Sequence, residues 1–115
     1  TKTKLKNWNM MTMEIFCNNK HLLDLAIRHA KALSVDSKDA VVTIKRLPPS
    51  FTQKGLIEYP RVLDKTTYID IYIKHDDERE ISLAHEMKHL EQVLDGRILD
   101  ENEAYLYEKH NKIRL

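Results

Sequence analysis

The sequence has very few residues that interrupt regular structure. Its 115 residues include only two glycines and three prolines, the residues that most often break helices and strands. We therefore expect a chain built mostly of helices and strands. Its length supports a single domain over residues 1–115 with one core. Within it, residues 1–13 are expected to form a loosely docked arm, attached through Trp8 and neighbouring methionines.

The sequence also has only one cysteine, a net charge close to zero and no long apolar run. The single Cys17 can form neither an internal disulfide nor a cysteine metal site. A formal net charge of +1 gives no reason to expect nucleic acid or an anionic membrane as a partner. No apolar run approaches the roughly 20 residues of a membrane span. Residues 1–9 are polar and basic with no apolar segment after them, so no signal peptide is visible. The expected location is the cytoplasm; a leader upstream of Thr1 and the oligomeric state stay open.

Apolar periodicity predicts the elements that precede the most informative segment. Residues 18–34 predict a helix that begins at Asn18 or Asn19. Residues 40–47 are rich in β-branched side chains and predict a strand. Residues 56–62 predict a short strand that Pro60 either ends or places at an edge.

A further strand is predicted where apolar and polar residues alternate. This strand runs from Thr67 to Ile73. One face carries Ile69, Ile71 and Ile73, and the other carries Tyr68, Asp70 and Tyr72. Such alternation is typical of a half-buried strand. The fold class is therefore α+β. One helix precedes a small mixed sheet of about three strands, and further helices follow it along the chain.

The most informative segment is His85-Glu86-Met87-Lys88-His89, which has the pattern H-E-x-x-H. It lies in a predicted helix from about Asp77 to Asp95, whose Leu83, Met87, Leu90 and Leu94 form one apolar stripe. Histidines four residues apart share one face of a helix, and here that face lies opposite the stripe. Two such imidazoles can bind one divalent ion, most often zinc.

A catalytic zinc site needs a third protein ligand. The last predicted helix, from about Asp100 onward, offers Glu103, with Glu101 as its rival. A helical hairpin around Gly96 would bring either carboxylate back to the histidine face. Asp100 and Glu103 also fit a capping box, in which case Glu103 would only stabilise the start of the helix.

With these residues the sequence resembles the gluzincin metallopeptidases, in which two motif histidines and a glutamate from a following helix bind zinc. It is most similar to the small single-domain minigluzincins and to ImmA/IrrE-like proteins, over about residues 67–107. Tyr105 departs from the Asp or Asn that usually follows Glu-Ala in those relatives. The resemblance implies a zincin-like fold: an N-terminal helix, the small sheet, an active-site helix and a glutamate helix.

A mechanism follows from the predicted site. Zinc held by His85, His89 and Glu103 would activate a water molecule, and Glu86 would act as general base and then protonate the leaving amine. The donor that stabilises the oxyanion could be Tyr107 or His110, which share a helix face with Glu103. His75, at the end of the preceding strand, is a further candidate, and packing roles for Tyr107 and His110 are equally open.

The expected partner is a peptide or protein substrate. In proteins that this chain resembles, the strand before the active-site helix pairs with an extended peptide. That strand would be Thr67, Tyr68, Ile69, Asp70, Ile71, Tyr72 and Ile73. His21 and His29 are expected on the surface of the first helix, without a role as ligands.

The leading hypothesis is therefore a zinc-dependent peptidase. The alternative is a zinc-binding regulatory or latent module with little or no proteolysis, whose site the C-terminal helix ending at residues 112–115 or the N-terminal arm could cover. Glu86 favours catalysis, since a pure binding site has no use for a general base. A metal-free interaction protein is the third hypothesis.

Overall fold

Residues 12–111 are described by the computed structural model, and within them the chain forms three helices and a mixed sheet of five strands. In chain order these elements are β1 (Glu14–Cys17), α1 (Lys20–Ala32), β2 (Ala40–Arg46), β3 (Gly55–Ile57), β4 (Arg61–Leu63), β5 (Thr66–Ile73), α2 (Arg79–Leu94) and α3 (Glu101–His110). The α+β class and the mixed sheet are confirmed. The expected strand number of about three was wrong, since the sheet has five.

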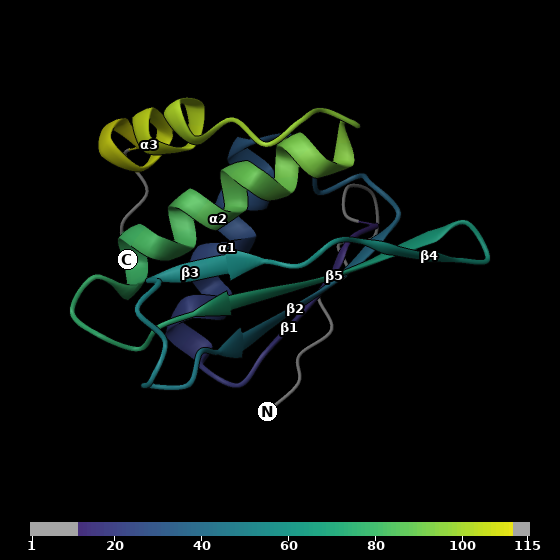
Figure 1. The fold of residues 1–115 in the computed structure, drawn as a ribbon. Helices are drawn as coiled ribbons and strands as arrows, with labels where there is room; N and C mark the ends of the chain where they lie inside the picture. The colour runs from purple at the N-terminus through teal and green to yellow at the C-terminus, as the bar shows by residue number, and fades with distance from the viewer. Residues whose placement is uncertain (1–11, 112–115) are drawn as a thin grey trace.

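The sheet has the order β1-β2-β5-β3, with β4 pairing with the other end of β5 (Figure 1). β1, β2 and β5 run parallel, whereas β3 and β4 are antiparallel to β5. Ile69, Ile71 and Ile73 are almost completely buried, as their alternation predicted. The strand predicted at residues 56–62 divides into β3 and β4, and Pro60 lies in the break between them.

One face of the sheet carries the core. Side chains of the three parallel strands pack there against α1 and α2, and α3 then packs on α2 (Figure 1). The stripe of α2 provides Leu83, Met87 and Leu90, each fully buried. Leu94 is partly buried against the same cluster.

The N-terminal prediction is corrected in part. Met13 is fully buried in the core, and β1 begins directly after it. Met13 is thus a core residue and not part of a loose arm. Residues 1–11 of the predicted arm, including Trp8, lie outside the described residues.

The helix ends show which capping predictions were right. Asn19 caps α1, and its side chain accepts a hydrogen bond from the amide of Leu22 at 3.0 Å. Asp100 caps α3 in the same way. The predicted cap Asp77 was wrong, because α2 starts after Glu78 with no side-chain cap. Gly96 has φ of +71°, a conformation that glycine adopts without strain, as expected at the end of α2.

No helix among residues 12–111 is both long enough and apolar enough to cross a membrane.

Candidate metal centre

Helix α2 brings the two motif histidines together. The rings of His85 and His89 lie one helical turn apart, with centroids separated by 4.7 Å. They face away from the apolar stripe, as the helical periodicity predicted, but toward α3 and not toward open solvent. His89 is only 2% exposed, and the His85 side chain is 20% exposed.

The first residue of α3 completes a three-residue group with them. Glu101 Oε1 lies 2.9 Å from His85 Nε2, and Glu101 Oε2 lies 3.1 Å from His89 Nε2. One potential ligand atom from each of the three residues falls within 4.8 Å of the other two. Tetrahedral zinc with bonds of about 2.1 Å separates its ligands by about 3.4 Å, so this group needs little rearrangement to hold the ion.

The structure does not bring the predicted third ligand, Glu103, to the two histidines. Its carboxylate forms a two-pronged pair with the guanidinium of Arg97, at 2.9 and 3.1 Å, and accepts a hydrogen bond from Gln92. Hydrogen bonding to Arg97, and then to Gln92, lowers the pKa of Glu103 to about 2. Residues two apart on a helix differ in direction by about 200°, so Glu101 and Glu103 cannot both face the histidines.

Each histidine also has an acceptor at its other ring nitrogen. His85 Nδ1 lies 2.6 Å from Glu108 Oε1, and His89 Nδ1 lies 2.8 Å from Gln92 Oε1. Gln92 is fully buried, and two hydrogen bonds to the backbone of Asp100 fix the orientation of its amide. Acceptors in these places orient imidazole ligands in metal sites.

Sequence reasoning missed both of these acceptors, although a signal was present. Gln92 lies three residues after His89, and Glu108 lies seven residues after Glu101. Both spacings place side chains on one face of a helix.

The chemistry of this donor set fits a zinc ion. A carboxylate and an amide oxygen only accept hydrogen bonds, so the Nδ1 atoms of His85 and His89 must donate to them. In neutral imidazoles the Nε2 lone pairs then point at the Glu101 carboxylate, which also has only lone pairs to offer. A cation between them satisfies all three groups. Two nitrogens and a carboxylate oxygen are ligands that zinc accepts.

Electrostatics agree with this reading of the donor set. Burial alone would lower the pKa of His85, but hydrogen bonds to Glu108 and Glu101 outweigh it, and the net pKa is raised. For Glu101, burial acts to raise the pKa, and the interactions with His85 and His89 outweigh it and lower the pKa. The group therefore attracts positive charge.

Glu86 lies beside this centre, between α2 and the edge strand β3. It is 5% exposed, and burial is the main reason that its pKa is raised to about 7. A Cβ atom at Gly55 would come within 3.0 Å of Glu86 Cγ and Oε2, so the absence of a side chain at Gly55 makes room for the carboxylate. The cleft there encloses about 410 Å³ and is lined by Gln53, Lys54, Gly55, Glu78, Ile81, Ser82, His85, Glu86 and Glu108.

Neither predicted oxyanion donor lines this cleft. The Tyr107 hydroxyl shares a 2.6 Å hydrogen bond with His29 Nδ1, which joins α3 to α1, and burial raises the pKa of Tyr107 to about 12. The Tyr107 ring packs against the core, so the structure does not bring this predicted donor to the cleft. His110 is exposed in the last turn of α3.

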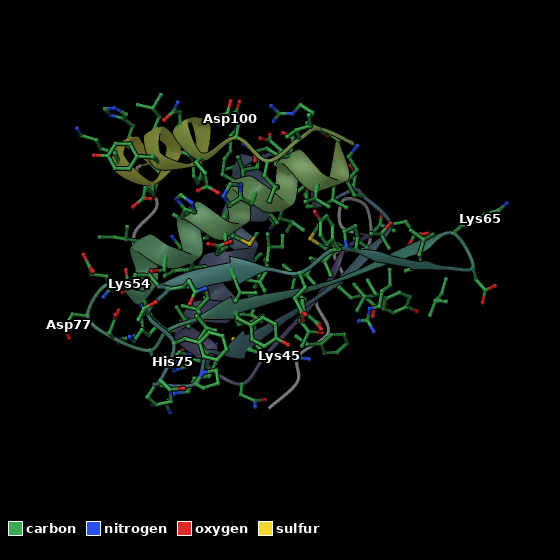
Figure 2. The ribbon with its side chains drawn as sticks, viewed as in Figure 1. Lys45, Lys54, Lys65, His75, Asp77 and Asp100 are labelled. Carbon is green, nitrogen blue, oxygen red and sulfur yellow. The ribbon has the colours of Figure 1, made fainter. Side chains whose placement is uncertain are left out.

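The other histidines lie apart from the centre. His29 is 2% exposed, so its predicted surface position was wrong. His21 pairs with Glu80 at 2.6 Å. His75 lines a separate hollow at the ends of β1 and β2, and Figure 2 shows it on the opposite side of the molecule from Asp100, the cap of α3.

The predicted substrate strand at residues 67–73 was also wrong, because β5 has no free edge. β2 pairs with it on one side over Thr67–Ile73. On the other side β4 pairs with Thr66–Tyr68 and β3 with Ile71–Ile73, and the amide of Glu58 donates to the Asp70 carbonyl between them. The strand that borders the cleft at the edge of the sheet is β3.

Comparison with known proteins adds no relative: no protein-family model, curated protein or solved structure matches this chain.

Proposed function

We propose that this protein is a zinc-dependent peptidase of the gluzincin type with a zincin-like fold. The observation that carries the proposal is the convergence of His85, His89 and Glu101 beside the buried carboxylate of Glu86. The ligand set leaves a coordination position for water, as catalytic zinc sites do. Bound zinc would lower the pKa of that water towards about 7.

Glu86 is the general base of the proposed reaction. Its carboxylate takes the proton of the attacking water and passes it to the amine of the leaving peptide. Glu108 and Gln92 hold the imidazoles in the orientation that presents Nε2.

The edge of β3 is the proposed docking strand for the peptide substrate. An extended peptide can add to an exposed sheet edge through backbone hydrogen bonds. Within residues 12–111, β3 ends the sheet and lies directly against Glu86, so a peptide paired with it would pass over the metal centre.

The decisive experiment combines metal analysis with one substitution. We expect about one zinc per chain in the wild type and in Glu86→Gln, because Glu86 is not a ligand. Hydrolysis of unfolded casein should fall about 100-fold or more in Glu86→Gln, the range for loss of a general base. Glu80→Gln, the same change on an exposed turn of α2, is the matched control and should keep both properties.

Full hydrolysis by Glu86→Gln would remove the proposed base. Zinc binding by a wild type that hydrolyses nothing would leave a zinc-binding module in place of a peptidase. A wild type that takes up no zinc would remove the proposal altogether.

A further inference from the structure

A second hollow lies at the far end of β3 from the cleft beside Glu86. It encloses about 610 Å³ between the segment that joins β3 to β4 and the segment that joins α2 to α3. We call it the apolar groove, because most of its lining is apolar. Its apolar lining residues are Ile57, Tyr59, Pro60, Val93, Ile98 and Leu99.

The two walls of the apolar groove expose large apolar side chains. Tyr59 on one wall is 94% exposed, and Ile98 on the other is 91% exposed. Leu99 beside it is 42% exposed. Single exposed apolar residues are common on protein surfaces, but a contiguous group on both sides of a groove is typical of a binding site.

The strand between the two hollows has a free backbone edge. Among the described residues, β3 pairs only with β5. Hydrogen bonds to β5 involve Lys54 and Glu58 at either end of the strand. Because such bonds alternate along an antiparallel pair, the N–H and C=O groups of Gly55 and Ile57 point to the free edge. An extended peptide is the ligand that such an edge fits.

Both walls of the apolar groove start close to the metal centre. Ile57 follows Gly55 by two residues, which is about 7 Å along a strand, and Gly55 lies against Glu86. On the other wall, Leu99 precedes the ligand Glu101 by two residues, so their Cα atoms are at most about 7 Å apart. One or two residues of an extended peptide span this distance.

The position of Glu86 sets the direction in which a substrate runs. The leaving amine must receive its proton from Glu86, so the part of the substrate that follows the scissile bond lies on the Gly55 side. The part that precedes the scissile bond then lies toward Ile57 and the apolar groove. This direction makes the substrate antiparallel to β3.

We infer that the apolar groove binds a bulky apolar side chain of the substrate on the N-terminal side of the scissile bond. The inference rests on the proposed peptidase function and adds to it a substrate class, peptides with large apolar residues before the cleaved bond. Tyr59 and Ile98 are the residues that determine this specificity.

The test uses the zinc-loaded full chain and a degenerate peptide library, with cleavage sites read by mass spectrometry. We expect bulky apolar residues to be enriched one to three positions before the cut. Two peptides that differ only by Leu or Ser at the preferred position are then compared. Ile98→Ser should lower kcat/KM for the Leu peptide about tenfold and change the Ser peptide little, as expected for loss of an apolar contact.

The matched control is Leu63→Ser, since Leu63 on β4 is also well exposed, at 62%, and does not line the groove. It should leave the Leu-to-Ser preference unchanged. Zinc content and melting temperature should be the same in all three proteins.

Two results would overturn the inference, and they are distinguishable. Cleavage by the wild type without apolar preference, or with a preference that Ile98→Ser leaves intact, overturns the apolar groove and keeps the peptidase. Zinc binding without any cleavage overturns the peptidase and the groove's role together.

Discussion

Helix α3 docks on the rest of the molecule in two places, and each place contains a buried histidine in a different setting. His89, at the contact with α2, and His29, at the contact with α1, are both 2% exposed. His89 has an acceptor at each ring nitrogen, Gln92 and Glu101. His29 shares its Nδ1 with the neutral hydroxyl of Tyr107. Burial therefore does not distinguish the proposed ligand His89 from the packing residue His29, whereas the acceptors around each ring do.

The largest effect is expected when each of the two glutamates at the start of α3 is replaced by alanine in turn. Glu101→Ala removes a proposed ligand, so zinc affinity should fall by more than the roughly 100-fold seen at most for outer partners of metal ligands. Glu103→Ala removes the pair with Arg97 and one hydrogen bond from Gln92. Gln92 keeps its two hydrogen bonds to the backbone of Asp100, so this variant should keep the affinity. Titration with zinc against a competing chelator measures both. The reverse result would return the ligand role to Glu103.

The stability of the metal-free protein should decrease in acid because of His29, at the contact between α3 and α1. Burial lowers the pKa of His29 from 6.5 to about 4. Between these values the unfolded chain binds more protons, so stability is full above pH 6.5 and falls as the pH drops through this window. The difference corresponds to about 3 kcal/mol at about 1.4 kcal/mol per pKa unit.

Urea unfolding at several pH values, with a chelator present so that metal release does not contribute, measures this loss. In His29→Gln the dependence between pH 6.5 and 4 should become shallower. An unchanged dependence would show that other groups cause it.

A smaller effect should follow from the acceptor behind His85. Glu108→Ala leaves all three proposed ligands in place but removes the carboxylate that lies against Nδ1 of His85. We expect zinc affinity to fall roughly 10- to 100-fold. Lys109→Ala, the neighbouring position on α3, is the control and should change little. Equal affinities of the two variants would mean that Glu108 plays no part in orienting the ligand.

The sequence was informative wherever the periodicity of a single element determined the answer. The H-E-x-x-H spacing placed His85 and His89 on one face of α2, and the alternation of residues 67–73 separated the buried isoleucines from the outward tyrosines. The motif also pointed to a carboxylate from the next helix. These features depend on which residues share one face of a single helix or strand, and the spacing of residues in the sequence determines that.

It failed where the answer depended on how two elements meet. The choice between Glu101 and Glu103 depends on the rotation of α3 about its axis, which the pairing of Arg97 with Glu103 and the burial of Ala104 help to fix. The free edge belongs to β3 and not to β5 because β2, β3 and β4 all pair with β5. His29 was expected at the surface but is buried. Its partner Tyr107 lies 78 positions further along the chain, and no local sequence pattern links two residues so far apart.

The sparse packing of α3 has a consequence for folding. Ala104 is its only fully buried residue among those described, and a ten-residue helix has little stability in isolation. The proposed ligands all lie between residues 85 and 101, so zinc would close a short segment of chain at small entropic cost. Bound zinc would thus link α3 to α2 and stabilise their packing. Uptake of the ion and completion of the fold at the C-terminal end would then be one equilibrium, in which each stabilises the other.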